Sequence, residues 1–449
     1  MTEFGAFGLV RKGTAQAIGA EDAIQRLRTG RGLPETVLPY GNGRSYGDTC
    51  LNDAGALIDM RSMKRILSFD AESGILTAEA GLMLSDLIAH VGPRGWFPAV
   101  VPGTQFVTLG GAIANDVHGK NHHRRGTFGC HVVSFTLLRS DGQTRHCSEQ
   151  ENVELFRATI GGMGLTGLIV EATIRLMKVA SVDVNEHVRG FSGLGEYFDL
   201  AEEADTNNEY AVAWLDQLAS GANAGRGFLL TANHAEDGEV YSSPSSPRLA
   251  IPFRPPLNLL NRWSLTLFNR AFAWSKARAE GVRRSSYQSY FFPLDAVRHW
   301  NRLYGPRGLL QHQSVVPFDA ARETIPAMLM AAREAGQASF LTVLKRFGDV
   351  ASPGILSFPR PGYTLTLDFS NAGSATYALF EQLDRMTVEA GGAVNPYKDA
   401  RMGADLFEAS FPGWRDLEAL RDPAFLSDFW RRTALQLPAE ATRGRHAAE

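Results

Sequence analysis

The chain has 449 residues, of which 44% are hydrophobic, a formal net charge of −3 and three cysteines. This length exceeds one ordinary domain, so we expect two or three, and the near-neutral charge gives no general attraction to nucleic acid. The odd number of cysteines and the absence of CxxC spacing indicate neither a disulfide framework nor a zinc site; these residues are Cys50, Cys130 and Cys147.

The first residues, MTEFGAFGLVRKG, lack a basic region followed by an apolar run and a cleavage site. They therefore do not resemble a Sec signal peptide. No uninterrupted apolar stretch is long enough to span a bilayer. We expect a soluble protein or a peripheral membrane protein, cytoplasmic or at a membrane surface whose side stays open.

Residues 34–80 predict short strands, because the apolar runs PETVLPY, ALIDM, RILSFD and GILTAEAG alternate with turn signals. The loop between the first two, residues 41–48, reads GNGRSYGD. Its three glycines permit positive φ angles and a close approach to a ligand. The loop is not a Rossmann fingerprint, because its glycine spacing is not GxGxxG and no apolar helix follows it. A GK[ST] phosphate loop is also absent.

Residues 101–123, VPGTQFVTLGGAIANDVHGKNHH, follow a helix expected in MLSDLIAHVG. Thr108 is a candidate helix N-cap, Gly110 and Gly111 carry no side chains, and an apolar helix is expected to end at Gly119. A helix opened by glycines lets an anion approach the backbone N–H groups, and the helix dipole favours negative charge there. The segment predicts either a pyrophosphate site or a helix-packing turn without a ligand.

A third glycine cluster, residues 161–164, precedes the long strand expected in GLTGLIVEATIRLM. A strand in HVVSFTLLRSDG and a short helix in ELFRATIG come before it. Three glycine loops, each beside a strand, are compatible with one elongated ligand lying along a sheet. They are equally compatible with three unrelated turns.

The pattern changes near Ala180. Residues 182–392 alternate strands, including one expected in YQSYFF, with long helices in FDAARETIPAMLMAAREAG and TYALFEQLDRMTVEAGG. This pattern predicts a substrate-binding domain built on an antiparallel sheet covered by helices on one face. We expect residues 1–181, completed by 393–449, to form the other domain, so that the whole chain is a two-domain α+β protein.

An insertion at about residues 237–286 interrupts the second domain. Its first part is rich in Pro and Ser. Residues 257–284 are apolar, aromatic and basic, with a single acid, Glu280. Such a segment predicts a lid or an element lying in an anionic membrane interface. The alternative is a helix docked on the core with its basic face in water. The basic residues are Arg262, Arg270, Lys276, Arg278, Arg283 and Arg284.

Three motifs, PYGNGRSYGD, VPGTQFVTLGGAIANDVHGKNHHRRGTFG and GGMGLTGLIVEATI, resemble the PCMH-type FAD-binding domain of the vanillyl-alcohol-oxidase-type oxidoreductases. Within that superfamily the likeness is nearest to the decaprenylphosphoryl-β-D-ribose 2′-oxidases, the flavoprotein half of an epimerase that makes an arabinose precursor of cell-wall arabinan. The likeness extends over nearly the whole chain, through FFPLDAVRHWNRLYGP, GLLQHQSVVP, FLTVLKRFG, SFPRPGYTLTLDF and YKDAR.

The resemblance implies an FAD cofactor whose pyrophosphate lies on the N–H groups of the first two glycine loops. Tyr46 stands where many relatives have a histidine bonded to the flavin, so we expect non-covalent FAD. Asn115, His118, Gly119 and Ile169 would lie along the isoalloxazine and ribityl side. The full expected cofactor-binding set is Gly41, Asn42, Gly43, Arg44, Ser45, Tyr46, Gly47, Gly103, Thr108, Gly110, Gly111, Asn115, His118, Gly119 and Ile169.

The implied chemistry moves a hydride from a sugar carbinol carbon to flavin N5 while the hydroxyl loses its proton. Such a site requires a proton acceptor and a positive group. Lys345 and Lys398 suit the positive role and a substrate phosphate, and His118 is the candidate for the proton. The expected catalytic set is His118, Lys398, Lys345 and Gln313; the expected substrate-binding set is Tyr46, Trp214, Phe291, Gln313, Lys345, Thr366 and Lys398; no metal is expected.

Structural roles remain open for several of these residues. His118 can simply cap the preceding helix or orient the flavin, and Lys345 and Lys398 can point to solvent. Gln311 and Gln313 share one face of their strand, with the intervening residue His312 on the other. The sequence does not say which face meets the core.

Two departures from the family pattern concern the substrate side. Thr366 occupies the place of a cysteine in the strand YTLTLDF, so covalent inhibitors that need that thiol should fail. A tyrosine expected two residues before the PLD turn is Phe291. Tyr290 precedes it and would lie on the opposite face of a strand, so the specificity for the lipid-linked sugar can differ from that of the relatives.

The sequence favours an FAD-dependent oxidoreductase that converts the 2′-hydroxyl of a polyprenylphosphoryl-β-D-ribofuranose to a ketone. A separate NAD(P)-dependent keto-reductase would complete the epimerisation, because the chain has no NAD fingerprint. Two alternatives stay open: an alditol or aldonolactone oxidase acting on a small soluble polyol, and a flavin-binding scaffold without turnover.

Overall fold

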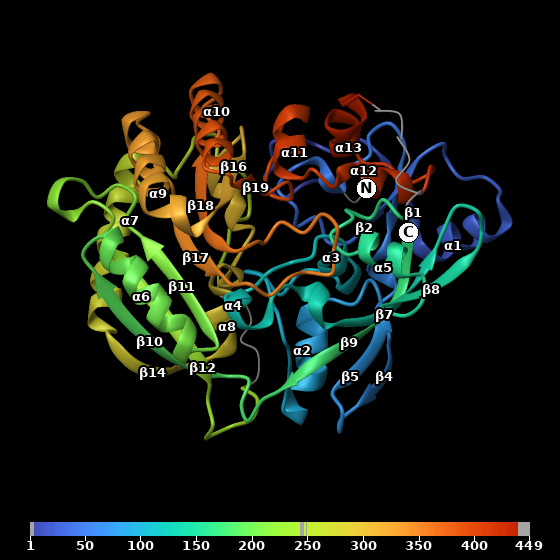
Figure 1. The fold of residues 1–449 in the computed structure, drawn as a ribbon, viewed down its shortest axis with the longest axis horizontal. Coiled ribbons are helices and arrows are strands. Elements are labelled where there is room, and N and C mark those ends of the chain that lie inside the picture. The colour runs from blue at the N-terminus through green and yellow to red at the C-terminus, as the bar shows by residue number, and fades with distance from the viewer. Residues whose placement is uncertain (1–3, 243–246, 248, 439–449) are drawn as a thin grey trace, which may run out of the picture.

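The computed structural model describes residues 4–242, 247 and 249–438 (Figure 1). Two α+β units lie side by side, each built on its own antiparallel sheet. Parts of the expected insertion, at 243–246 and 248, and of the expected C-terminal stretch, at 439–449, lie outside the described residues.

The first unit contains a three-stranded parallel sheet and an antiparallel sheet that runs in the order β4-β5-β9-β7-β8, with β6 paired to β9. Its strands are β1 (Gln16–Gly19), β2 (Val37–Tyr40), β3 (Ala56–Asp59), β4 (Ile66–Asp70), β5 (Ile75–Glu79), β6 (Trp96–Pro98), β7 (Val132–Leu138), β8 (Thr144–Ser148) and β9 (Leu168–Lys178). Its helices are α1 (Ala20–Thr29), α2 (Leu84–Val91), α3 (Leu109–Ala114), α4 (His122–Arg125) and α5 (Val153–Thr159).

The second unit is an eight-stranded antiparallel sheet in the order β14-β10-β12-β11-β17-β18-β16-β19. Its strands are β10 (Val184–Phe191), β11 (Tyr210–Leu215), β12 (Gly227–His234), β14 (Gly281–Ser285), β16 (Leu309–Val316), β17 (Val343–Phe347), β18 (Gly362–Ser370) and β19 (Ala393–Val394). The helices of this part are α6 (Leu194–Asn207), α7 (Arg262–Arg278), α8 (Tyr287–Phe291), α9 (Phe318–Glu334) and α10 (Ser374–Glu389), and a short parallel pair joins β13 (Leu249–Ala250) to β15 (Val297–Arg298).

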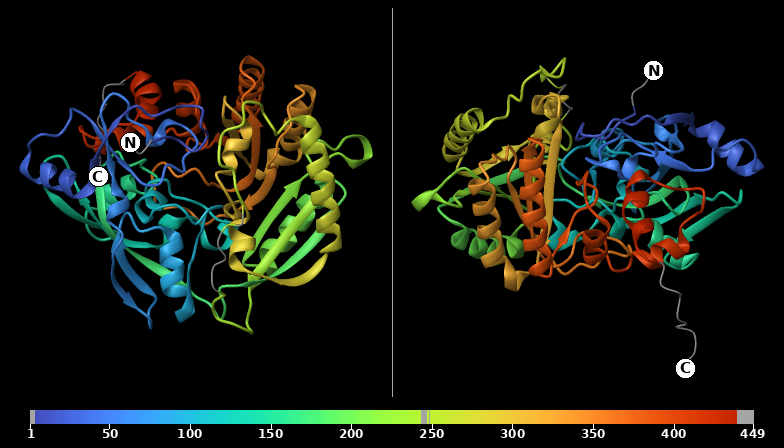
Figure 2. Two further views of the ribbon diagram at one scale, coloured as in Figure 1. Left: turned by 180° about the vertical axis from the view of Figure 1, so that it is seen from behind. Right: turned by 90° about the horizontal axis from the view of Figure 1, so that it is seen from above.

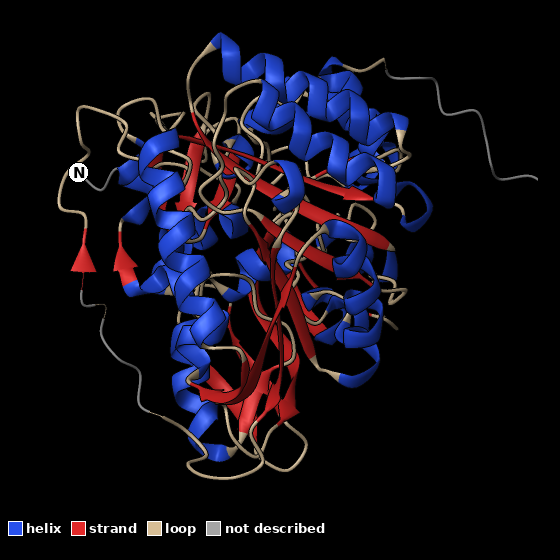
Figure 3. Cartoon of the chain, turned by 90° about the vertical axis from the view of Figure 1, so that its left-hand side faces the viewer, coloured by secondary structure: helices blue, strands red, loops and turns tan. Residues whose placement is uncertain are grey.

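Helices lie on both faces of the eight-stranded sheet, with α6, α9 and α10 on one face and α7 on the other (Figures 2 and 3). The expectation of helices on one face alone is therefore wrong, because α7 packs Phe272 against Trp214 on the second face. On β18 the residues that pack into the core with α6, α9 and α10 alternate with polar ones, as a half-apolar strand requires. The apolar set is Tyr363, Leu365, Leu367 and Phe369, and the polar set is Thr364, Thr366 and Asp368. The polar face is the one that meets the first unit.

The C-terminal helices return to the first unit and pack against β2. The N–H of Val37 donates to the carbonyl of Ala424 at 2.7 Å, and the N–H of Leu426 donates back to the carbonyl of Val37 at 3.0 Å. Arg432 forms an ion pair with the buried Asp48 at 2.7 Å. The chain therefore leaves the eight-stranded sheet after β19 and helps to close the glycine-loop region. These helices are α11 (Ala404–Ser410), α12 (Trp414–Leu420) and α13 (Asp428–Arg432).

The strands expected in residues 34–80 are confirmed as β2, β3, β4 and β5. The strand expected in YQSYFF is wrong: these residues form α8, because the hydroxyl of Ser286 accepts the N–H of Ser289 and caps a helix there. The apolar helix after Thr108 ends at Ala114 rather than Gly119, since Asp116 has a φ of 41° and His118 is bridged to Thr127 in an extended conformation.

The basic, aromatic segment at 257–284 forms α7, a helix of 17 residues, followed by β14. The side-chain amide oxygen of Asn261 accepts from the N–H groups of Trp263 and Ser264, and the hydroxyl of Ser264 accepts from the N–H of Asn261, so the helix begins with a reciprocal cap. Among the residues that the structure describes, no helix is long and apolar enough to cross a membrane.

Candidate active site

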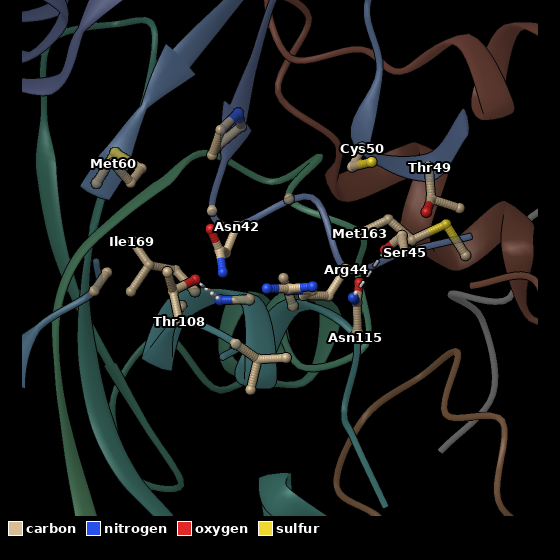
Figure 4. Close-up of a pocket in the computed structure, with 18 of the residues that line it drawn as sticks. Asn42, Arg44, Ser45, Thr49, Cys50, Met60, Thr108, Asn115, Met163 and Ile169 are labelled. Carbon is tan, nitrogen blue, oxygen red and sulfur yellow. Dashed lines mark hydrogen bonds between the residues drawn. The ribbon is translucent and has the colours of Figure 1, made fainter. Parts of the chain in front are cut away.

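A pocket opens in the first unit between the loop at 41–45, the start of α3 and β9 (Figure 4). It encloses about 810 Å³, part of which is open to solvent. Ten residues of the expected cofactor set line it: Gly41, Asn42, Gly43, Arg44, Ser45, Thr108, Gly110, Gly111, Asn115 and Ile169. The remaining wall includes Met60, Ala80, Val107, Val117 and Met163, so the pocket combines a polar loop with apolar sides.

The loop at 41–45 presents its backbone to this pocket. Within residues 4–242, 247 and 249–438, the N–H groups of these five residues have no hydrogen-bond acceptor. Most backbone N–H groups that water cannot reach find an acceptor, so a run of free donors beside a pocket fits an anionic ligand. Gly43 makes the turn possible, because its φ is +58° and a Cβ there would collide with the Tyr40 hydroxyl.

Side chains hold this loop against the segment before α3. The amide of Asn42 donates to the carbonyl of Phe106 at 2.7 Å, and the Nε of Arg44 donates to the same carbonyl at 3.3 Å. The amide of Asn115 donates to the hydroxyl of Ser45 at 3.4 Å. The Arg44 guanidinium packs 5.4 Å from the ring of Phe7, and burial lowers its pKa. A positive charge thus lies beside the free donors.

Thr108 is confirmed as the N-cap of α3, since its hydroxyl accepts the N–H of Gly111 at 3.1 Å. The N–H of Gly110 donates to the carbonyl of Ala80 at 2.7 Å, and that of Leu109 to the carbonyl of Leu82 at 2.8 Å. These donors of the helix N-terminus are already used within the chain. The free donors for a pyrophosphate therefore belong to the first glycine loop.

The third glycine loop also reaches the pocket, through Met163, Gly164 and Gly167. None of the three was in the expected residue set, although the glycine cluster at 161–164 was the signal for them. Met163 and Gly164 have φ angles of 58° and 75°, which lets the chain turn beneath the ligand space.

Five members of the expected cofactor set do not line the pocket: Tyr46, Gly47, Gly103, His118 and Gly119. Tyr46 is buried with its ring 5.2 Å from that of Phe7, on the side of the eight-stranded sheet. Gly119 is buried behind the pocket wall, next to the carbonyl of Val101.

A second cluster forms where the polar face of β16, β17 and β18 meets the end of the α3 segment. Gln313 on β16 is opposite Thr366 on β18, and Lys345 on β17 is opposite Thr364. The amide nitrogen of Gln313 lies 3.2 Å from Nε2 of His118, which belongs to the first unit. His312 points to the other face and bonds to Asp384 of α10 at 3.1 Å. The structure thus decides the face of β16 that the sequence left open.

A chain of hydrogen bonds fixes the tautomer of His118. The backbone N–H of Tyr397 donates to Oδ1 of Asn395 at 3.0 Å, so the Asn395 amide nitrogen faces Gln313 Oε1, at 2.9 Å. The Gln313 nitrogen must then point to Thr364 and to Nε2 of His118. His118 therefore accepts at Nε2 and carries its proton on Nδ1. Burial, and then the Lys345 ammonium, hold the pKa of His118 well below its usual value, so the ring is neutral.

The partly buried Lys398 and the buried Asp368 influence each other's charge next to Tyr46. The Lys398 ammonium lies 4.2 Å from the Tyr46 ring centre. Asp368 on β18 accepts a hydrogen bond from the amide of Gln311. Burial raises the pKa of Asp368 to about 7, while burial, opposed by the Asp368 charge, lowers the pKa of Lys398 to about 8. Asp368 was not anticipated from the sequence; its place on the same strand face as Thr366 was the available signal.

Two expected substrate residues lie away from this cluster. Trp214 on β11 shares the polar face of the sheet but is buried under α7, with its ring 4.7 Å from that of Phe272. Phe291 is buried between Phe97 and Tyr210, at ring distances of 5.2 and 4.8 Å. Among the described residues, no group of three or more His, Cys, Asp or Glu side chains is placed to hold a metal ion.

Comparison with known proteins agrees with this geometry. Residues 16–148 match the family described as "FAD binding domain". The chain is 34% identical over 419 residues to the decaprenylphosphoryl-β-D-ribose oxidase of Mycolicibacterium smegmatis, a match that covers 89% of each chain. It is 33% identical over 375 residues to an uncharacterised Streptomyces coelicolor protein encoded in the mprA 5′ region, covering 79% of this chain and 100% of that one. The L-gulonolactone oxidase of Bos taurus is 31% identical over 160 residues, 36% of each chain.

The fold, the pocket and the matched domain define an FAD-dependent oxidoreductase of the vanillyl-alcohol-oxidase type, with a two-domain α+β architecture. Its similarity to the mycobacterial protein covers 89% of the chain and is not limited to the matched FAD-binding region. The chain belongs to the decaprenylphosphoryl-β-D-ribose oxidase family.

Proposed function

We propose that this protein oxidises the 2′-hydroxyl of a polyprenylphosphoryl-β-D-ribofuranose to the 2-keto sugar. The observation that carries the proposal is the second cluster, where Gln313, Lys345 and Lys398 meet His118 at the junction of the two units. The family relative supports it, because that protein is named as an oxidase of this kind of lipid-linked sugar along the same length of chain.

We propose that FAD binds non-covalently, with its pyrophosphate on the free N–H groups of residues 41–45 and its rings against the apolar walls. Bound FAD would supply the acceptor for the hydride. Tyr46 has no nucleophilic nitrogen, unlike the histidine found at this position in many relatives, and burial raises the pKa of its hydroxyl well above the usual value. Arg44 contributes positive charge beside the phosphates.

In the second cluster the residues divide the chemistry between them. His118 is neutral, and its Nε2 lone pair is engaged by Gln313, so we propose that it orients groups through its Nδ1–H instead of acting as a strong base. Asp368, with its raised pKa, is suited to accept a proton, and Lys398 to stabilise negative charge that develops on the sugar oxygen. Thr366 lies beside Gln313 on the same face.

We also propose that the lipid tail and the membrane surface meet α7. Four large apolar side chains of this helix are exposed, among them Trp263 at 86% and Leu267 at 70%. The basic residues Arg262, Arg270 and Arg278 belong to the same helix. Exposed apolar and cationic side chains on one helix fit the interface of an anionic bilayer. A peripheral contact of this kind requires no spanning segment.

The ketone would be consumed by a separate protein. The sugar must receive a hydride on the opposite face to complete an epimerisation, and the described glycine loops do not form a GxGxxG strand-turn-helix unit. We therefore propose that a distinct NAD(P)-dependent keto-reductase acts on the product.

The test is an anaerobic absorbance spectrum before and after addition of farnesylphosphoryl-β-D-ribofuranose, followed by acid precipitation. Bleaching of the flavin band, with yellow colour released into the supernatant, is expected. Bleaching by a free alditol or aldonolactone, and not by the lipid-linked sugar, would show that the substrate is a small polyol. Flavin that no sugar reduces would leave a binding scaffold, and yellow colour retained in the pellet would mean a covalent flavin.

A further inference from the structure

Two lysines from different units lie close together at the edge of the second cluster. The carbonyl of Lys120 accepts the N–H of Ala211 on β11 at 2.9 Å. Two residues along that strand, Ala213 pairs with Leu344 on β17, and Lys345 is the next residue of β17. The backbone ladder therefore brings Lys120 beside Lys345, although 225 positions separate them in the sequence.

Neither ammonium group has an ion-pair partner among the described residues. Lys120 lies 4.1 Å from the ring centre of Tyr290 and donates to the carbonyl of that residue. Lys345 lies 5.9 Å from the ring centre of Phe347. An aromatic ring lies near each ammonium group and a carbonyl also accepts from Lys120, but neither contact neutralises the charge.

Two carboxylates near the pair are already engaged by other groups: Glu209 bonds to Arg125 at 2.7 Å and accepts from the amide of Asn121. Glu186 on β10 is buried and bonds to Arg283 at 2.9 Å, Ser285 at 2.7 Å and Lys276 at 3.4 Å. Burial lowers the pKa of both Lys120 and Lys345 to about 7. The Lys345 ammonium lowers the pKa of Lys120 further, and the Lys398 ammonium does the same for Lys345. Two partly buried ammonium groups with no ion-pair partner among the described residues are costly without an anion, so the arrangement indicates a binding site for one.

Lys120 and Lys345 lie between the second cluster and α7, and this position indicates which anion they bind. Lys345 faces the sugar side, since its charge acts on His118 and His122, whose rings flank Phe347 at 5.0 and 4.6 Å. Lys120 faces the α7 side, where its charge is influenced by Glu186 and by Lys276 of α7. A ligand that crosses from the sugar site to α7 must pass both ammonium groups.

We propose that Lys120 and Lys345 bind the phosphodiester that joins the sugar to its lipid, and so orient the sugar toward the flavin and the tail toward α7. This inference rests on the proposed function for the identity of the ligand. The anion subsite itself follows from the paired lysines. Lys120 is a binding residue that the sequence did not single out.

The test is binding, measured by perturbation of the flavin spectrum and by calorimetry. The ligands are farnesylphosphoryl-β-D-ribofuranose and the uncharged farnesyl β-D-ribofuranoside. The wild-type protein is expected to prefer the phosphodiester at least 30-fold. Lys120→Met and Lys345→Met are each expected to reduce this preference at least tenfold, while Lys120→Arg, which keeps the charge, retains it within about threefold. Binding of the phosphodiester at pH 7.5 should take up protons, and Lys120→Met should lessen the uptake.

The control is Lys178→Met, because Lys178 is exposed and also lies over an aromatic ring, 4.6 Å from that of Trp96. Its preference should stay within twofold of wild type. Equal binding of the two ligands by wild type, or an unchanged preference in Lys120→Met with normal flavin content, overturns the subsite. Tight phosphodiester binding without flavin reduction would instead overturn the proposed oxidation and leave the subsite intact. If inorganic phosphate weakens binding of the phosphodiester and of the uncharged riboside equally, the lysines do not bind the phosphate of the substrate.

Discussion

The Nε2 atom of Gln313, on β16, lies 3.2 Å from Nε2 of His118, in the segment that follows α3. This contact joins the two units across 195 positions of sequence. It occupies the lone pair of the histidine, and its direction is fixed by Asn395 and the backbone N–H of Tyr397. The backbone N–H of Tyr397 therefore fixes the orientation of Asn395, and through it the orientation of Gln313 and the tautomer of His118.

Replacement of Asn395 by aspartate should disturb this chain of bonds. A carboxylate cannot donate to Gln313 Oε1, so the Gln313 amide should turn and His118 should carry its proton on Nε2, with a raised pKa. We expect kcat to fall by about tenfold, the equivalent of one lost hydrogen bond of about 1.4 kcal/mol, with KM little changed. Nitrogen NMR of His118 reads the tautomer. Asn207→Asp, an exposed amide on α6, is the control, and an unchanged His118 spectrum in Asn395→Asp would contradict the assignment.

The Asp368 and Lys398 pair should govern the pH dependence of flavin reduction. With pKa values of about 7 and about 8, the pair carries both charges only in the window between them. We expect reductive rates to fall below about pH 7 and above about pH 8. Because the Asp368 charge raises the pKa of Lys398, Asp368→Asn should remove the acid limb and shift the alkaline limb to lower pH. An alkaline limb that does not move in Asp368→Asn would show that the Asp368 charge does not influence the pKa of Lys398.

Replacement of Lys398 by methionine should abolish turnover without loss of the fold. Its pKa is lowered in the folded protein, so the folded state binds fewer protons than the unfolded one and the buried ammonium costs stability most fully below about pH 8. The variant should gain more melting temperature, relative to wild type, at pH 6 than at pH 9. Flavin content should remain normal. A gain that is greater at pH 9 would reverse the sign of the argument.

Gly43→Ala should lose FAD, because a Cβ at a φ of +58° strains the loop and collides with the Tyr40 hydroxyl. Gly30→Ala is a matched control: Gly30 also has a positive φ, +65°, but a Cβ there meets open space at the end of α1. Both variants should lose about 1 kcal/mol of folding stability from the left-handed backbone. Only Gly43→Ala should purify with a low ratio of flavin to protein. Equal ratios in the two variants would show that the loop at 41–45 does not bind FAD.

Thr366→Cys should make the protein sensitive to covalent inhibitors that need a thiol at this strand position. The wild-type chain should form no adduct with them, because burial raises the pKa of Cys50 to about 12, that of Cys147 to about 11 and that of Cys130 above its usual value, which leaves all three thiols protonated. Intact-mass analysis and peptide mapping locate the adduct. Modification of wild-type protein with loss of activity would contradict this prediction.

Removal of the apolar side chains of α7 should weaken contact with anionic vesicles. Trp263→Glu together with Leu267→Glu should reduce co-sedimentation at least tenfold, while Met330→Glu, at an exposed apolar residue on α9, should leave it unchanged. Reduction of the flavin by a short, water-soluble analogue should stay normal in both. Equal sedimentation of the two variants would place the membrane contact elsewhere.

The sequence by itself determined the glycine loops, most of the strands and helices, and the family, while ten of the fifteen residues expected to bind the cofactor line the pocket. These are local properties, because a run of glycines, a cap such as Thr108, or an alternating strand states its conformation within about ten residues. The one strand assigned wrongly, at α8, was a short aromatic run in which Ser286 acts as a cap, and apolar periodicity cannot separate the two structures over so few residues.

Only the tertiary structure decided which donors are free and which charges are paired. The N–H of Gly110 donates to the carbonyl of Ala80, whereas the N–H groups of residues 41–45 have no acceptor among the described residues. No local sequence pattern predicts this difference. The state of His118, the pairing of Asp368 with Lys398 and the approach of Lys120 to Lys345 each depend on residues brought together from distant segments. Burial and neighbouring charge set these properties, and both arise only when the sheet of the second unit closes against the loops of the first.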